Sequence, residues 1–288
     1  MRGTSKRKRH VGRTIFCTLF SFLLSVFLTI ASILMAIRIG FFNKELIFEY
    51  LDKVDFYNEV QQEVYKQVSY EIVPTGLELD LIDETIPIEK IHNDVNGYIE
   101  ACFDNTEYAI DTTEIEDAMY QNIMDQFENM ERQEDTGTQE HARRFISNIM
   151  EKYPDIIKFP YIKEFSDIST RIQPLITLIM IAAIVMGVVC ILFLLLLQRW
   201  KHRSLRYIIY AILAAALMTV VVPVYLLIQK TYEGLGIRPI YLYNFCMEYI
   251  KASLFSFVWI GIVWLGIAVF LMIVIKLMKE RLKKRKYR

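Results

Sequence analysis

Long uncharged runs dominate the pattern of hydrophobic and polar positions along this chain. Four stretches contain no Asp, Glu, Lys, Arg or His: 14–37, 174–197, 207–228 and 252–275. About 20 apolar residues in a helix span a hydrocarbon core about 30 Å thick. A buried helix of a soluble protein keeps a polar stripe and seldom exceeds about 14 fully apolar residues. The pattern therefore predicts four transmembrane helices.

The first apolar run has a second interpretation, a cleaved signal peptide. Basic residues precede it as they would in a leader: Arg2, Lys6, Arg7, Lys8, Arg9 and Arg13. The apolar core of a leader has roughly 7 to 15 residues, and a small-x-small cleavage site follows it. This run is longer and lacks a convincing site, so we expect an uncleaved anchor.

Basic residues gather in three short segments beside the runs. Segments 1–13 and 199–206 carry no acid, and segment 276–288 has Glu280 as its single acid. In a chain that crosses four times these three segments lie on one side of the membrane. Short loops rich in Lys and Arg stay cytoplasmic, so we expect both termini inside the cell.

The expected fold is an all-α membrane protein in which a helical extracytoplasmic domain is inserted between the first two of four transmembrane helices. Its expected segments are a basic cytoplasmic tail (1–13), the first crossing (14–39), an acidic extracytoplasmic helical domain (40–172), the second crossing (173–198), a basic cytoplasmic loop (199–206), the third crossing (207–228), a short extracytoplasmic loop (229–251), the fourth crossing (252–275) and a basic cytoplasmic tail (276–288).

Apolar residues at three- and four-residue steps predict the helices of the large domain. We expect a helix that continues from the first crossing through Leu46 to Ile72 and ends at Pro74–Gly76. A second helix opens with Pro87, and a third begins at Thr113, with Glu116 completing a capping box. The run 131–139 is expected to be a flexible loop, and a fourth helix, 142–153, to stop before Pro154.

Two further segments connect this domain to the crossings. Aromatic residues between Pro154 and Arg171 fit a membrane–water boundary, and Pro174 is expected to mark or kink the start of the second crossing. Segment 229–251 is too short to fold alone. We expect it on the membrane surface or against the large domain.

The candidate chemical groups are few, and we predict no catalytic, cofactor-binding or metal-binding residue. His92 and His141 stand in no HExxH pattern and no Cys/His cluster, which favours exposed helix residues. Carboxylates cluster at Asp80, Asp83 and Glu84 and again at Asp111, Glu114, Glu116 and Asp117. The stretch 104–115 fails the EF-hand spacing. Neither a G-x-S-x-G elbow nor a phosphate-binding loop occurs in the sequence.

The four cysteines and the glycosylation pattern give weaker signals. Cys17 and Cys190 lie inside crossings as small apolar fillers. Cys102 and Cys246 lie in outer or interfacial segments, which leaves a disulfide between them as one alternative. Cys102, however, falls on the apolar face of a predicted helix. The sequence contains no Asn-x-Ser/Thr acceptor, which favours a bacterial cell membrane.

The apolar runs also contain small residues at four-residue steps, which permit close helix contact: Ser21, Ser25 and Thr29; Ala183 and Gly187; Ala211 and Ala215; Ala252 and Ser256. No ionisable residue interrupts the runs, which disfavours autonomous ion-coupled transport.

The charge of each expected segment bears on its partners. Residues 41–172 carry 30 Asp and Glu against 11 Lys and Arg, which argues against nucleic acid because phosphate binding needs Lys and Arg. The basic C-terminal tail suits either a topology signal or anionic lipid. Beyond the lipid bilayer, the expected partner is a membrane or envelope protein.

We therefore expect a non-enzymatic protein whose outer domain binds a ligand, an envelope component or a protein partner, as a sensor, scaffold or accessory subunit. The order of one crossing, a large outer domain and three crossings resembles the permeases of MacB-type ABC exporters in topology. That resemblance implies an export subunit with a separate ATPase. The family's cytoplasmic coupling motif is missing from the short segment 198–206. A third hypothesis is a membrane-surface enzyme that uses Asp80, Asp83 and Glu84.

Overall fold

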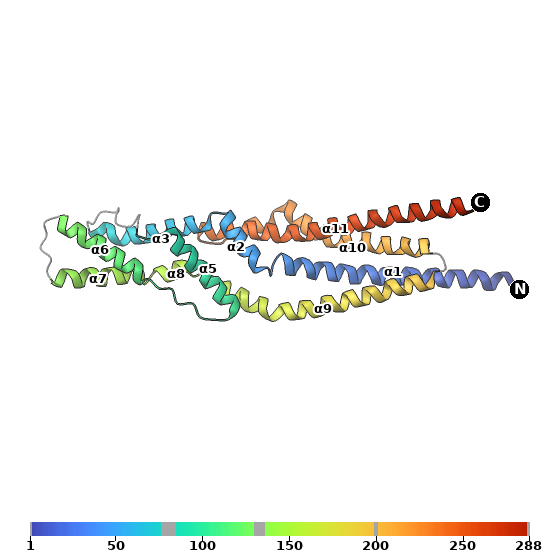
Figure 1. Cartoon of the computed structure of the whole chain (residues 1–288), viewed down its shortest axis with the longest axis horizontal. Coiled ribbons are helices and arrows are strands. Elements are labelled where there is room, and N and C mark those ends of the chain that lie inside the picture. The colour runs from blue at the N-terminus through green and yellow to red at the C-terminus, as the bar shows by residue number, and fades with distance from the viewer. Residues whose placement is uncertain (1, 76–84, 130–135, 199–200, 287–288) are drawn as a thin grey trace. The chain divides into compact units, whose positions relative to one another are not determined.

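The computed structural model describes residues 2–75, 85–129, 136–198 and 201–286 (Figure 1). Helices make up most of these residues, and no strand occurs among them. They form two compact units. Unit 1 comprises Met1–Leu46, Ile172–Gly236 and Cys246–Arg288, and unit 2 comprises Ile47–Arg171 and Ile237–Phe245.

Unit 1 is built from four long helices, each long and apolar enough to cross a membrane. They are α1 (Arg2–Ile39), most of α9 (Ile162–Leu197), α10 (Lys201–Gln229) and most of α11 (Ile240–Lys286). Large apolar side chains cover their outer faces, and Leu196, Ile228 and Trp259 are 80%, 73% and 66% exposed. Apolar surface left in water costs about 25 cal/mol per Å², a cost that vanishes in hydrocarbon. The four membrane-capable helices predicted from the sequence are thus confirmed.

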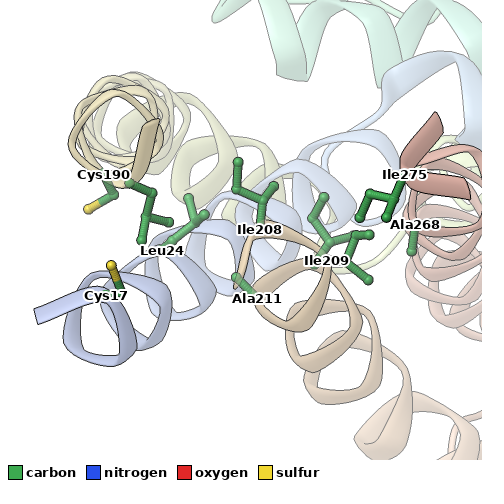
Figure 2. Close-up of a cluster of buried hydrophobic side chains, with 10 residues drawn as sticks. Cys17, Leu24, Cys190, Ile208, Ile209, Ala211, Ala268 and Ile275 are labelled. Carbon is green, nitrogen blue, oxygen red and sulfur yellow. The ribbon is translucent and has the colours of Figure 1, made fainter. Parts of the chain in front are cut away.

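The interior of unit 1 is a cluster of small and branched apolar side chains from all four helices. Figure 2 shows Leu24 of α1 between Cys190 of α9 and Ile208 of α10, with Ile209 toward Ala268 and Ile275 of α11. The Phe20 and Phe193 rings stack at 5.0 Å. The bundle is therefore held together by close apolar contact.

Hydroxyl groups supply many of the polar contacts of this bundle, and the buried Gln198 amide adds others by accepting from Arg13 and donating to Cys17 Sγ. Ser21 Oγ donates to the Tyr207 carbonyl oxygen at 2.8 Å, and Trp264 Nε1 donates to Ser32 Oγ at 2.7 Å. In hydrocarbon a polar group has no water to bond, so it must find a partner inside the protein.

The small residues of the apolar runs lie largely where helices meet. Ser21, Ser25, Ala183, Gly187, Ala211 and Ala215 are buried, while Thr29, Ala252 and Ser256 are half-buried. Just beyond α1, a Cβ on Gly40 would lie 2.9 Å from the Ser253 carbonyl oxygen. Only glycine allows this approach without a shift of one backbone.

Unit 2 is a helical domain formed mainly by the residues that follow α1. It contains most of α2 (Lys44–Lys53), α3 (Phe56–Ile72), η1 (Val73–Thr75), α5 (Ile88–Asp104), α6 (Thr113–Asn129), α7 (Thr136–Met150), α8 (Tyr153–Ile157), the first turns of α9 and residues 237–245 before and within α11. Its core uses the predicted apolar faces: Val60, Val64, Val68 and Ile72 of α3, Ile91, Val95 and Ile99 of α5, and Ile115, Met119 and Ile123 of α6 are all buried.

The single helix predicted from the first crossing to Ile72 is wrong. Helix α1 ends at Ile39, and α2 and α3 are separated near Asp55, whose φ is 57°. Asp tolerates this left-handed conformation better than most residues because its short side chain bonds locally. Here Asp55 Oδ1 accepts from the Asn58 amide. The apolar residues keep their three- and four-residue spacing across this turn, so the sequence pattern does not reveal where the helix breaks.

The helix predicted over 142–153 is also placed wrongly. Helix α7 ends at Met150, and Tyr153 begins α8, with Pro154 in its first turn rather than beyond its end. Proline suits a first turn because the missing N–H has no helical partner there. Of the expected loop 131–139, residues 136–139 belong to α7, and 131–135 lie outside the described residues.

The structure also bears on three features expected near helix starts. Helix α6 does begin at Thr113, but Thr113 bonds to Asp111 while Glu116 accepts from Thr112 Oγ1 at 2.6 Å, so the expected Thr113–Glu116 capping box does not form. Pro174 lies inside α9, which begins earlier, at Ile162. Pro87 directly precedes α5, as expected of a helix start.

Candidate functional site

The described part of unit 2 contains an open groove of about 660 Å³. One wall is a polar face of α3, and the other is the segment that leads into α11. We call it the polar groove; its lining residues are Glu59, Gln62, Glu63, Lys66, Arg238, Pro239, Ile240 and Tyr241. Small-molecule sites occupy roughly 300–1,000 Å³, so the polar groove has the size of a ligand site.

An aromatic cluster fixes the two walls of the polar groove. The Phe56 ring lies 5.3 Å from the Tyr241 ring and 6.1 Å from the Phe245 ring. Phe159 lies 5.7 Å from Phe56 and 5.3 Å from Phe245. Aromatic pairs at these separations stabilise by about 0.5–1.5 kcal/mol beyond the area they bury. The wall formed by residues 237–245 is therefore held in place by packed rings.

The charges of the polar groove are mixed and only partly paired. Glu59 accepts from Asn244 Nδ2 at 3.2 Å, and Glu63 lies 3.4 Å from Lys66 Nζ. Arg238 is exposed at the lip, and no residue that the structure describes pairs with it. The polar groove thus presents two carboxylates, an ammonium group and one unpaired guanidinium group.

A second polar cluster, around Asp94, is buried inside unit 2. The Asp94 side chain, 1% exposed, accepts from Tyr153 Oη at 2.9 Å, Tyr108 Oη at 3.1 Å and Lys90 Nζ at 3.2 Å. Burial, and then the Asp94 charge, raise the pKa of the Tyr108 phenol. The Asp94 cluster ties α5 to α8 and to the segment before α6. Its role is structural, because the hydrogen-bond donors and acceptors of the cluster bond to one another.

The two histidines singled out in the sequence lie apart from any cluster of ligands. His141 is exposed on α7. His92 is half-exposed, its ring lies 4.5 Å from that of Tyr57, and its Nε2 lies 3.9 Å from Asp52 Oδ1. Within the described ranges, no group of three or more His, Cys, Asp or Glu could hold a metal ion.

The acidic cluster around Asp111 acts in helix capping. Asp111 accepts from both the backbone N–H and the hydroxyl of Thr113, and these bonds lower its pKa. Glu114 and Asp117 are exposed on α6. Asp80, Asp83 and Glu84 lie outside the described residues.

All four cysteines are free thiols. Cys102 is half-buried, and its carbonyl oxygen accepts from Ser166 Oγ at 2.6 Å. Burial raises the pKa of the Cys102 thiol, and a raised pKa lowers the reactive thiolate fraction at neutral pH.

Sequence reasoning missed the polar groove. One wall could have been predicted, because polar residues at three- and four-residue steps indicate one polar helix face: Glu59, Gln62, Glu63 and Lys66. Nothing local links that face to Arg238 and Tyr241, far along the chain. Comparisons with protein-family models, curated proteins and solved structures find no match.

Proposed function

We propose that this chain is a multi-pass cell-membrane protein with cytoplasmic termini, and that unit 2 faces the outside and binds a ligand in the polar groove. The protein acts as a sensor, scaffold or accessory subunit rather than as an enzyme. The observation that carries the proposal is the polar groove itself, with its unpaired Arg238.

Charge supports the proposed orientation. The three short segments assigned to the cytoplasm, 1–13, 199–206 and 276–288, are rich in Lys and Arg. The segment that forms most of unit 2 carries a net negative charge. Lys and Arg in short loops set the orientation of a membrane protein. Helix α10 begins at Lys201, so Arg203 and Arg206 form part of a basic helix end.

The lining of the polar groove supports a ligand that carries both signs of charge. Arg238 offers a guanidinium group that forms paired hydrogen bonds with a carboxylate or phosphate. Glu59 and Glu63 offer acceptors for a cationic group on the same ligand. A short peptide or an amino-acid-like zwitterion has this chemistry and fits about 660 Å³.

Site-specific photocrosslinking in native membranes tests this proposal. A benzophenone amino acid replaces the exposed Gln62 in the polar groove, and its adducts are identified by mass spectrometry. The same probe at Asp117, exposed on α6 and outside the groove, measures background. We expect a defined adduct at Gln62 alone.

Charge reversal gives the matched variants. Arg238→Glu places a third carboxylate in the polar groove, and like-charge contact costs several kcal/mol, so adduct yield falls about tenfold or more. Arg144→Glu, at a residue on α7 outside the groove, leaves the yield unchanged. Equal adduct yields at Gln62 and Asp117, or an adduct yield at Gln62 that Arg238→Glu does not change, would contradict the proposal. Stoichiometric copurification of an ATPase would instead favour the export-subunit alternative.

A further inference from the structure

Unit 1 contains an apolar cavity of about 360 Å³ between α1, α9 and α11. We call it the lateral cavity. Its walls come from residues 28–35 of α1, 180–191 of α9 and 260–267 of α11. The one polar pair in its wall is satisfied internally, because Trp264 Nε1 donates to Ser32 Oγ and Ser32 Oγ donates to the Leu28 carbonyl oxygen. Water in this space would find no free partner.

The dimensions of the lateral cavity match one hydrocarbon chain. A protein cavity of about 150 Å³ holds one benzene molecule of six carbons. By that measure a space of about 360 Å³ holds on the order of 12 to 14 carbons. The wall on α9 runs from Met180 to Ile191, which at about 1.5 Å per residue makes the cavity about 16 Å long.

A helix of a partner protein or of a second copy is too large for this space. A helix with its side chains is about 10–12 Å across. Over the length of the lateral cavity it would occupy a volume of roughly 1,300–1,800 Å³, several times the space available. A flexible lipid tail fits where a helix does not, and it is the material that surrounds these apolar helices.

A cation lies at the end of the same face of α1. Leu28, Ala31, Ser32 and Met35 recur at three- and four-residue steps, and Arg38 follows Met35 by three residues. Residues three apart on a helix are neighbours on its surface. Arg38 is exposed and pairs with no residue that the structure describes. A long Arg side chain at a helix end extends its charged group to the level of lipid headgroups.

We propose that unit 1 binds a single anionic phospholipid, with one acyl chain in the lateral cavity and its phosphate paired with Arg38. The lipid fills a space that the four helices leave open and joins α1, α9 and α11 through shared apolar contact.

The test uses the purified full chain in lipid nanodiscs that contain phosphatidylglycerol with a diazirine in one acyl chain. After photolysis, adducts are mapped by mass spectrometry. We expect them to concentrate on the peptides around Met180, Ile184 and Val263. The lipid-exposed positions Leu217 and Val221 of α10 should carry several-fold fewer.

Two leucine substitutions separate a specific site from general lipid contact. Gly187→Leu fills the lateral cavity, and a Cβ there would meet only Leu24 Cδ1, at an ordinary 3.7 Å. Gly266→Leu is the matched control, because a Cβ at Gly266 has nothing within 4 Å. We expect Gly187→Leu to lower adduct yield in the cavity about fivefold, and Gly266→Leu to leave it unchanged. Ile184→Trp, also in the wall, is the second variant should Gly187→Leu fail to fold.

Arg38→Gln tests the headgroup contact. In native mass spectrometry the parent protein should retain phosphatidylglycerol over phosphatidylcholine, and Arg38→Gln should abolish that preference. The proposal is overturned by adducts spread evenly over lipid-facing positions, by an adduct yield that neither filling variant changes, or by a lipid preference that survives Arg38→Gln.

Discussion

The described parts of the two units differ in whether they bury a carboxyl group. In unit 1 most of the buried polar side chains are hydroxyls such as Ser21 and Ser32, which bond to a backbone carbonyl or to an indole. The buried Gln198 amide accepts from Arg13 and donates to Cys17 Sγ. In unit 2 a carboxyl group, Asp94, is buried among two phenols and an ammonium group. Lipid excludes charge at high cost, whereas a water-facing domain can bury a charge that is fully paired. This difference is the one that a lipid-facing unit 1 and a water-facing unit 2, as proposed above, would require.

Removing the Asp94 carboxyl should have the largest effect. Asp94→Ala leaves two tyrosine hydroxyls and the Lys90 ammonium group without their acceptor, and breaking a buried pair costs about 3–5 kcal/mol. Hydrogen exchange of the full chain should show this loss of protection in α5 and α8. Asp117→Ala, at an exposed residue of α6, should change protection by less than about 0.5 kcal/mol. Equal effects of the two variants would refute the structural role of Asp94.

A methyl group at Gly97 should disturb the same cluster from outside. A Cβ there would lie 2.5 Å from the Tyr108 ring, so Gly97→Ala forces that ring away from Asp94. We expect about 1–3 kcal/mol of destabilisation by the same exchange measurement. In a Tyr108→Ala background the added cost should largely disappear. A penalty that persists there would mean that backbone effects, not the ring, set the need for glycine.

Alkaline pH should destabilise unit 2 through its buried phenols. Burial, and then the Asp52 charge, raise the pKa of Tyr57 to about 12, against the lowering effect of its bond to Asn96. The folded state therefore holds a proton that the unfolded state releases near pH 10. This contribution is complete below pH 10 and is lost as pH rises toward 12.

Thermal unfolding between pH 9 and 12 measures this contribution. Tyr57→Phe should flatten part of the alkaline fall in melting temperature, whereas Tyr70→Phe, at a residue that is 62% exposed, should leave it unchanged. The same alkaline slope in the parent and in Tyr57→Phe would rule out the titration of Tyr57.

A single hydroxyl in unit 1 should have the smallest effect. Ser32→Ala removes the acceptor of Trp264 Nε1, and hydrogen bonds between membrane helices contribute about 0.6 kcal/mol on average, with a maximum near 1.7. Ser253→Ala is the control, because the buried Ser253 Oγ has no partner among the described residues. Unfolding in a denaturing detergent should show a loss of stability for Ser32→Ala and none for Ser253→Ala. A larger loss for Ser253→Ala would contradict the assignment.

The sequence allowed unit 1 to be predicted better than unit 2. A run such as 174–197 indicates a membrane-capable helix by length alone, whatever its neighbours. The spacing of apolar residues continues through the break at Asp55 and the turn before Tyr153. Tertiary contacts, rather than local sequence, therefore determine where these helices end. The polar groove and the lateral cavity each combine segments far apart in the chain. One wall of each, on α3 and on α1, follows helical spacing, but no local pattern identifies the opposite wall.

The orientation of the chain is the claim on which the proposed function rests, and cysteine labelling tests it most directly. In a variant with all four native cysteines replaced, Glu114→Cys on α6 and Lys279→Cys on α11 are introduced separately. Both parent residues are exposed. A membrane-impermeant maleimide should label the Glu114→Cys protein in intact cells, and the Lys279→Cys protein only after the membrane is opened. Labelling of the Glu114→Cys protein that requires opened membranes would contradict the account.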